Sequence, residues 1–253
     1  MNWIGLYTFI RREVSRILRV ATQTIISPLI SATLYIFIFG YVIGTRIDLI
    51  AGVEYITFVF PGILMLNIIT SAFSHSSSSV YMGRFMKSIE DVLVSPFSHF
   101  EIVIGYTAGA VIRALLVSVG VLLVGVLFGA VTLEHPLQFF FYVTAVSTVF
   151  ALLGILVGLW ANSFEQLAVL NTFIITPLSY LGGIFYSISM LPQNVQFLTH
   201  INPFFYFVDG IRGSMIGITE AQSGVGLMII GGLIIGLGLL VVHLFNIGWR
   251  IRS

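Results

Sequence analysis

The sequence lacks cysteine and carries little charge. Its 253 residues include no cysteine and a single lysine, and only 8% of them are charged, whereas about 25% of the residues in soluble domains are charged. The absence of cysteine excludes a disulfide framework, a thiol nucleophile and a cysteine-based metal site. Because 58% of the residues are hydrophobic, the composition indicates an integral membrane protein.

Motifs for nucleotide hydrolysis and for hydrolytic catalysis are also absent from the sequence. There is no GxxxxGK[ST] motif, because the only lysine, Lys87, is not preceded by glycine at the required position. Neither HExxH nor GxSxG occurs, and the five histidines are not spaced as metal ligands. We therefore expect no ATP hydrolysis, no catalytic residue, no metal and no cofactor in this chain.

Six apolar runs are long enough to cross a bilayer, which takes about 20 helical residues. They span residues 22–43, 55–73, 102–131, 137–161, 167–185 and 225–247. Pro28 and Pro177 lie inside two of these runs and are expected to kink them. The predicted fold is thus an all-α integral membrane protein, with residues 1–253 forming one membrane domain.

The N-terminal segment, residues 1–21, alternates apolar and basic positions. A helix here would place Trp3 and Tyr7 on one face and its arginines, Arg11, Arg12, Arg16 and Arg19, around the other. This pattern is typical of an amphipathic helix in the membrane interface, with the arginines facing phosphates and water. Two interpretations remain open, namely a basic membrane anchor and a helix that also contacts a partner protein.

The longest later break in hydrophobicity lies between the second and third predicted spans. Within it, residues 80–96 are predicted to form a short helix that ends before a proline. Its apolar positions recur at helical spacing and its charged positions lie on the other face. Such a helix can lie on a membrane or dock in the groove of a partner. The segment contains Arg84, Phe85, Lys87, Ile89, Glu90, Asp91, Leu93 and Pro96.

The placement of basic residues predicts the orientation of the chain. With both termini in the cytoplasm, eight basic residues fall inside and only Arg46 and Arg212 fall outside, which agrees with the positive-inside rule. Arg113 lies within the third predicted span, where snorkelling or a pair with Glu165 or Glu101 would account for it. The eight inside residues are Arg11, Arg12, Arg16, Arg19, Arg84, Lys87, Arg250 and Arg252.

Polar residues inside the predicted spans are few and gather in the fifth span. Most such residues join helices by hydrogen bonds, and lining a translocation pathway is the alternative role. No carboxylate lies near the middle of a span, which disfavours coupling to a proton or sodium gradient. The candidate pathway residues are Tyr35, Asn67, Asn171, Thr172, Thr176 and Tyr180.

Residues 186–224 are too apolar for a free outer loop and too interrupted to span a membrane. We expect short helices that re-enter the outer leaflet, which backbone can do only where it is buried in protein or lines a water-filled cavity. Asp209 and Arg212, at positions i and i+3, can form a pair that stabilises the fold. The candidate outer-gate residues are Asn202, Pro203, Asp209 and Arg212.

Three stretches of this chain resemble permeases of the ABC-2 type transporter family. Residues 84–106 are similar to the cytoplasmic loop of that family in Glu90, in Leu93 followed by Ser95 and Pro96, and in Gly105. Residues 198–215 share its outer stretch of Asn-Pro followed by arginine, and residues 176–192 resemble the end of its fifth span. The chain departs from the family at one place. A Gly-Thr pair often precedes the acidic residue in that loop, whereas this chain has Lys87, Ser88 and Ile89 before Glu90.

The resemblance covers nearly the whole chain and favours small bacterial permeases of the NodJ and polysaccharide-export kind. It implies a six-span half-transporter of the type V exporter fold in the inner membrane. Two copies would pair and bind a separate ATPase subunit, which would hold ATP and magnesium. The loop helix would be the coupling helix that sits in a groove of the ATPase, and the N-terminal helix would also contact that subunit.

Two other functions remain open on the sequence alone. An ion-coupled secondary transporter would require transport that collapses with the proton or sodium gradient. A membrane scaffold subunit would show no transport in proteoliposomes. The cargo is not specified by the sequence, and the candidates are a lipid, a glycolipid or polysaccharide, and a drug-like molecule; no nucleic acid is expected.

Overall fold

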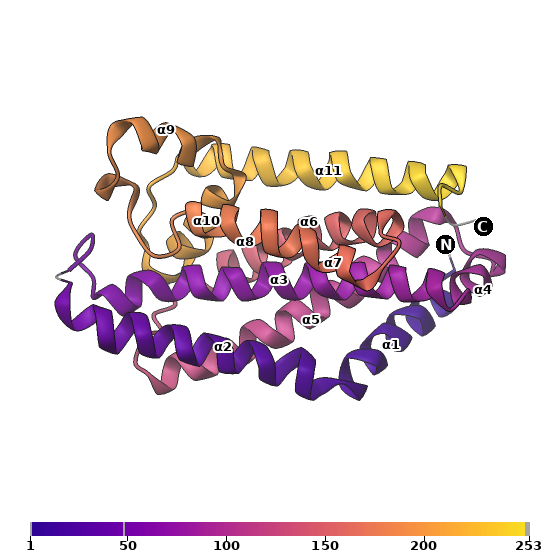
Figure 1. Ribbon diagram of the computed structural model, residues 1–253, viewed down its shortest axis with the longest axis horizontal. Helices are drawn as coiled ribbons and strands as arrows, with labels where there is room; N and C mark the ends of the chain where they lie inside the picture. The colour runs from indigo at the N-terminus through magenta and orange to yellow at the C-terminus, as the bar shows by residue number, and fades with distance from the viewer. Residues whose placement is uncertain (1, 48, 251–253) are drawn as a thin grey trace.

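The computed structural model describes residues 2–47 and 49–250, and Arg252 lies outside them. The described chain is helical and forms a long bundle (Figure 1). Its α-helices are α1 Trp3–Arg19, α2 Ser27–Tyr35, α3 Tyr55–Phe85, α4 Ser88–Val94, α5 His99–Leu127, α6 Pro136–Trp160, α7 Phe164–Leu170, α8 Thr176–Leu181, α9 Gln193–Ile201, α10 Pro203–Ile216 and α11 Ser223–Ile247. Three π-helical segments, η1 Thr22–Ile26, η2 Ile36–Ile43 and η4 Asn171–Ile175, and two 3-10 turns, η3 Gly44–Arg46 and η5 Ile188–Met190, complete the elements.

Five helical stretches in the described residues are long and apolar enough to cross a membrane. They are the continuous run Thr22–Arg46, α3, α5, α6 and the Gly224–Ile247 part of α11. The fifth predicted span, residues 167–185, corresponds instead to α7, η4 and α8, which together are not among these five stretches. Among the described residues, length and composition therefore support five of the six predicted spans, and a shorter, interrupted helical stretch lies where the fifth predicted span was expected.

The run Thr22–Arg46 and the stretch of α7, η4 and α8 both contain π-helical turns next to a proline. Pro28 and Pro177 each stand near the start of an α-helix that directly follows a π-helical segment. Proline has no N–H to donate to the preceding turn and its ring crowds the carbonyl there. A wider π turn accommodates both effects, and π segments are frequent at functional sites.

Helix α3 is the central element of the bundle and packs on α5, α6 and α10. It continues through the serine run to Phe85 instead of ending at Phe73, the predicted end of the second span. The hydroxyls of Ser76 and Ser78 donate to carbonyls of the preceding turn, those of Ala72 and Ser74. The serines thus satisfy their own polar groups within the helix, so their polarity does not end it.

The serine run allows α3 and α6 to approach closely. A Cβ atom on Gly154 of α6 would collide with Ser76 Oγ and stand 2.6 Å from the carbonyl oxygen of Phe73. A Cβ atom on Gly158, one turn later, would stand 2.7 Å from the carbonyl oxygen of Ser77. Small residues that let backbones meet are typical of helix contacts in membranes. The serine run, which interrupts the hydrophobicity of the sequence, is therefore the surface of α3 that packs against α6.

The polar and irregular elements gather at the two ends of the bundle. Helices α1 and α4 and the end of α11 lie at one end, and α9, α10 and the turn after η2 lie at the other (Figure 1). Residues 186–224 fold into η5, α9 and α10 and a loop into α11. All residues of α10 except Pro203 and Tyr206 are buried, so this helix is enclosed by protein.

The contact between α3 and α6 predicts the effect of Gly154→Leu. The new side chain has no room against Ser76 and the carbonyl of Phe73, so overpacking should cost about 1–3 kcal/mol or more. The midpoint temperature of unfolding in detergent should fall clearly. The matched control is Gly236→Leu in α11, where nothing lies within 4 Å of the new Cβ. Equal melting temperatures for the two variants would contradict this packing.

Candidate functional site

The turn between α3 and α4 positions the short helix at one end of the molecule. Lys87 joins the two helices with φ of 56°, in the left-handed region. Non-glycine residues adopt this region at a cost of about 1–2 kcal/mol. The chain thus forms a sharp turn without glycine, and α4 is set at an angle to the long helix α3.

Helix α4 is attached to the bundle by its apolar side. Ile89 and Val92 are 2% and 5% exposed and belong to a core cluster that also contains Phe9, Val80 and Tyr106. The predicted apolar stripe of α4 therefore faces its own chain at Ile89, and this residue is not open to a partner. The cluster fixes α4 to α1, α3 and α5 at once.

Arg84 is also engaged within its own chain. Its Nη1 donates to the carbonyl oxygens of Gly158 at 3.0 Å and Ala161 at 2.9 Å, and its Nε donates to the carbonyl of Arg250 at 2.8 Å. The last carbonyls of a helix have no partner within that helix. Arg84 therefore closes the end of α6 and holds the segment after α11.

The free surface around α4 combines apolar and charged side chains. Phe85 is 66% exposed, Met86 67% and Val94 87%, and Leu93 is half-buried. Met86 and Val94 were not among the predicted contact residues, although both are large apolar side chains beside the predicted helix. We call the exposed set the α4 surface; it consists of Phe85, Met86, Lys87, Glu90, Asp91, Val94 and Pro96.

Helix α1 lies in a groove made by two glycines of α5. A Cβ atom on Gly105 would collide with the ring of Phe9, and one on Gly109 would stand 2.8 Å from Glu13 Cβ. The two glycines are four residues apart, as are Phe9 and Glu13, so they lie on facing stripes of the two helices. Glu101 completes the attachment by accepting from the N–H groups of Asn2 at 2.6 Å and Ser98 at 2.8 Å.

Glu13 is the buried charge between α1 and α3. It is 2% exposed, accepts from Ser79 Oγ at 2.7 Å, and lies 3.2 Å from Arg16 Nη2 and 3.4 Å from His75 Nε2. Burial by itself raises the pKa of Glu13, but the contacts with His75, Arg16 and Ser79 outweigh it and lower the pKa to about 2. The carboxylate is therefore ionised at neutral pH and ties the two helices together.

Sequence reasoning did not identify Glu13, although a signal was present. The buried residues of α1 are Leu6, Phe9, Glu13 and Ile17, which form one helical stripe. A single carboxylate on the apolar stripe of a basic helix marks a buried ion pair, because an unpaired buried charge is too costly. Of the predicted contact arginines, Arg16 lies by Glu13, Arg12 Nη2 lies 3.4 Å from it, and Arg11 is exposed.

A second polar cluster lies at the opposite end and is centred on Arg212. This side chain is 0% exposed; its Nη2 donates to the carbonyl of Gly183 at 2.6 Å and its Nε to that of Phe58 at 3.4 Å. Its guanidinium carbon lies 4.0 Å from the centroid of the Phe58 ring, a cation–π contact. Arg212 thus joins α10 to α3 and to the turn after α8.

The carboxylate that faces Arg212 is Glu220, which sequence reasoning missed. Its Oε2 lies 3.7 Å from Arg212 Nη1, and it accepts from Ser187 Oγ and from the N–H of Ile188. Asp209 instead accepts from the N–H groups of Glu220 at 2.7 Å and Ala221 at 3.2 Å. Among the described residues Asp209 and Arg212 form no ion pair, and the predicted i, i+3 pair is replaced by these contacts.

Asn202 and Pro203 begin α10. The Asn202 side chain accepts from the N–H of Phe204 at 3.1 Å and donates to the carbonyl of Leu178 in α8 at 2.7 Å. Pro203 stands in the first turn, where its missing N–H costs nothing. These two outer-gate candidates therefore act as a helix cap that also fixes α10 against α8.

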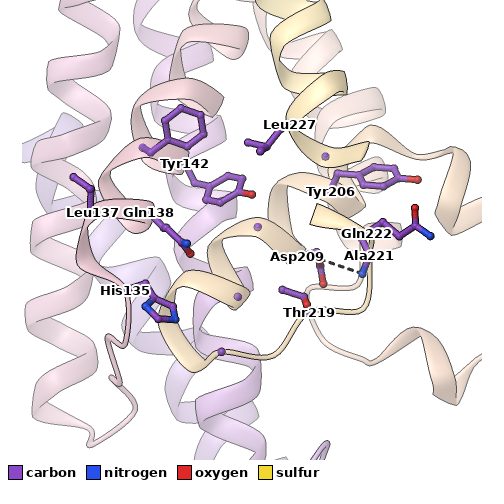
Figure 2. Close-up of a pocket in the computed structure, with 15 residues that line it drawn as sticks. His135, Leu137, Gln138, Tyr142, Tyr206, Asp209, Thr219, Ala221, Gln222 and Leu227 are labelled. Carbon is purple, nitrogen blue, oxygen red and sulfur yellow. Dashed lines mark hydrogen bonds between the residues drawn. The ribbon is translucent and has the colours of Figure 1, made fainter. Parts of the chain in front are cut away.

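A cavity of about 540 Å³ lies beside this cluster, between α6, α10 and α11. Figure 2 shows Tyr142 and Tyr206 at its wall and Asp209 bonded to the loop before α11. Gln138, Gln222 and His135 also line it. Among residues 2–47 and 49–250, no group of three His, Asp or Glu side chains could hold a metal.

The predicted pathway residues are only partly brought together. The hydroxyls of Tyr35 and Tyr180 are 2.9 Å apart and join the end of α2 to α8. Asn67 is buried and donates to the carbonyl of Ile63 within its own helix. On η4, Thr172 is exposed, and Thr176 Oγ1 donates to the carbonyl of Asn171. The two tyrosines thus join segments that are far apart in the sequence, whereas the bond from Thr176 to Asn171 joins consecutive elements.

Comparison with known proteins identifies the family. The profile of the ABC-2 type transporter family matches residues 5–216. This chain belongs to the ABC-2 type transporter family. It is 37% identical over 222 residues to the inner membrane transport permease YadH of Escherichia coli K12, covering 87% of this chain and 86% of that protein.

Other relatives of this ABC-2 chain are nodulation proteins. It is 28% identical over 224 residues to nodulation protein J of Rhizobium meliloti strain 1021, covering 88% of this chain and 84% of that protein. It is 25% identical over 219 residues to the protein of the same name from Rhizobium leguminosarum bv. viciae, covering 86% and 83%. Family membership and five membrane-length helices make the chain a multi-pass membrane protein.

The buried carboxylate predicts the effect of Glu13→Gln. The change removes the charged acceptor of Ser79 Oγ and the anion that faces Arg16 and Arg12, and should cost about 1–3 kcal/mol, because the two arginines keep part of their surface in water. The folded pKa of about 2 lies below the ordinary value of 4.5, so the contribution of Glu13 is present above pH 4.5 and is lost as pH falls through 2. Hydrogen exchange at neutral pH should show faster opening of α1. Exposed Glu90→Gln is the control, and equal exchange in both variants would contradict the role of Glu13.

The Arg212 cluster predicts the effect of Glu220→Gln. The amide keeps the shape but removes the charge facing Arg212 and weakens the bonds from Ser187 and Ile188, at a cost of about 1–3 kcal/mol. The unfolding midpoint should fall, and limited proteolysis should cut the loop between α10 and α11 faster. Exposed Glu165→Gln, at the opposite end, should change neither quantity. Unchanged proteolysis of Glu220→Gln would mean that the cluster does not hold this loop.

Proposed function

We propose that this chain is the permease subunit of an ATP-driven exporter, acting as a homodimer with a separate ATPase subunit. Membership of the ABC-2 family supports a membrane subunit, and the lack of a GxxxxGK[ST] motif means that nucleotide hydrolysis requires another chain. The observation that carries the proposal is the α4 surface, an exposed apolar and charged patch at the end of the longest buried helix.

The α4 surface suits docking into a protein groove. Large apolar side chains at Met86 and Val94 are 67% and 87% exposed, and charged Lys87, Glu90 and Asp91 surround them. Interface cores of this composition, with an apolar centre and a polar rim, are typical of protein partners. Closure of the ATPase would move α4, and because Ile89 is buried, the movement would pass to α1, α3 and α5.

The proposed orientation places α4 and both termini in the cytoplasm. Seven basic residues among the described part of the chain lie at the α4 end, which is the side the positive-inside rule assigns to the cytoplasm. The inner membrane as location is supported by the name of the relative YadH. Arg212 and its cluster then lie at the outer end, where a change in packing would open or close an exit.

In the homodimer, the pathway would run along the side formed by α2, η2, η4 and α8. Apolar side chains on this side are open, including Phe37 at 51% and Phe173 at 73%, and Tyr35 and Tyr180 meet there. Two copies joined here would enclose these polar groups between them. The cargo would be a lipid, a glycolipid or polysaccharide, or a drug-like molecule.

The proposal is tested by isolating the membrane complex and measuring transport in proteoliposomes. A co-purifying ATPase with a Walker motif and ATP-dependent transport are the expected results. Transport driven by a proton or sodium gradient without ATP would identify a secondary transporter instead. No transport under either condition would identify a scaffold.

The α4 surface predicts the effect of charge reversal at Glu90. Loss of one interface hot spot costs about 2 kcal/mol, so Glu90→Lys should weaken ATPase retention and coupled transport about thirtyfold. The unfolding midpoint should not change, because Glu90 is exposed. Glu54→Lys, an equal charge reversal at an exposed site of the opposite end, is the control. Full coupling in Glu90→Lys would remove this surface from the proposed mechanism.

A further inference from the structure

A second cavity of about 540 Å³ lies at the cytoplasmic end, between α1, the end of α3 and the start of α4. Four arginines line it together with hydroxyl groups of serine and threonine. Tyr106, which is 1% exposed, forms its inner wall. The polar lining includes Arg11, Arg12, Ser15, Arg16, Arg19 and Ser88.

The cavity has an excess of positive charge. Its only carboxylate is Glu13, which already accepts from Ser79 and faces both Arg12 and Arg16. Arg12 and Arg16 keep half and more than a third of their side-chain surface exposed. Arg11 and Arg19 have no ion-pair partner among the described residues. An anion entering the cavity would therefore meet fork-shaped donors that suit phosphate oxygens.

Helix α1 presents three different faces. Its buried stripe contains Phe9 and Glu13, and its cavity stripe contains Thr8, Arg11, Arg12, Ser15 and Arg19, which recur at helical spacing. The third face is apolar and open: Trp3 is 69% exposed, Ile4 82%, Tyr7 67% and Leu18 59%. Exposed tryptophan and tyrosine beside arginine are typical of a helix at the level of lipid headgroups.

The start of the first membrane-length run indicates the level of the cavity relative to the membrane. The run Thr22–Arg46, whose most apolar part is only 11% buried, begins three residues after Arg19. Arg19 and Arg16 therefore lie where a span enters the bilayer, which is where lipid phosphates lie. Anionic lipids are concentrated at this level and attract basic segments to the membrane surface, whereas free phosphate is not concentrated there.

We propose that this cavity binds the phosphate-bearing headgroup of an anionic phospholipid, with its acyl chains along the open apolar face of α1. The phosphate lies among Arg11, Arg16 and Arg19, and the hydroxyls of Ser15 and Ser88 contact the headgroup. Ser88 is the first residue of α4, so an occupied cavity bridges α1 and the turn that carries the α4 surface. Bound lipid would thereby stabilise the arrangement of these two helices.

Lipid binding in this cavity is measured on the isolated chain, without ATP or a partner protein. Native mass spectrometry of the purified chain from micelles with equal phosphatidylglycerol and phosphatidylcholine should show one preferentially retained phosphatidylglycerol per chain. Each arginine near an anionic lipid contributes about fivefold in affinity, so Arg11→Gln with Arg19→Gln should weaken retention about thirtyfold. Arg46→Gln, which removes an exposed arginine at the opposite end, is the control and should have no effect.

A second change distinguishes a cavity from general surface charge. Ser15→Trp fills the cavity without altering charge and should also weaken phosphatidylglycerol retention; Thr8→Trp serves if Ser15→Trp does not fold. Equal retention of the two lipids, or wild-type retention in the filling variant, would overturn the proposal. So would equally tight binding of inorganic phosphate, which would identify a free-anion site. If the filling variant loses ATPase association and the protein shows no preference between the two lipids, the cavity is a protein contact and the proposal is overturned.

Discussion

The charge of Glu13 is the constraint that organises one end of this molecule. A carboxylate that is 2% exposed must be compensated, and Arg16, His75 and Ser79 do so from α1 and α3. The compensation requires close approach, which Gly109 of α5 permits because it has no side chain. Helices α1, α3 and α5 therefore meet at one point. Helix α4 is attached to the same three helices through Ile89.

Helix α3 connects this point with the polar cluster at the other end. Ser79, near its end, bonds to Glu13, and Phe58, near its start, accepts from Arg212 and stacks under it. A helix of 31 residues is about 46 Å long. Its close contact with α6 through Gly154 and Gly158 leaves little freedom to bend. The two ends are thus joined by one packed helix, which suits the discrete movement of a transporter between two arrangements.

Much of the fold follows from the sequence, and the exceptions have physical causes. Apolar runs and proline positions predict the membrane helices, and the helical recurrence of apolar residues within 80–96 predicts a short helix there. The second span was predicted to end before the serine run, but α3 continues through it. Serine hydroxyls can donate to carbonyls of their own helix, so polarity alone does not indicate a loop. Glu13 was missed because its partners His75 and Ser79 are distant in the sequence, and Glu220 was missed because it lies in the irregular loop between α10 and α11. Ile89 lies on the predicted apolar stripe, but which side that stripe faces depends on packing.

Attachment of a photo-cross-linker tests most directly whether the α4 surface receives the ATPase. The chain has no cysteine, so Met86→Cys provides a unique site for a maleimide benzophenone in the assembled complex. Cross-linking to the ATPase is predicted from Met86→Cys. None is predicted from Leu137→Cys, because Leu137 is 85% exposed beside the cavity at the opposite end (Figure 2). An ATPase cross-link from Leu137 with none from Met86 would contradict the account.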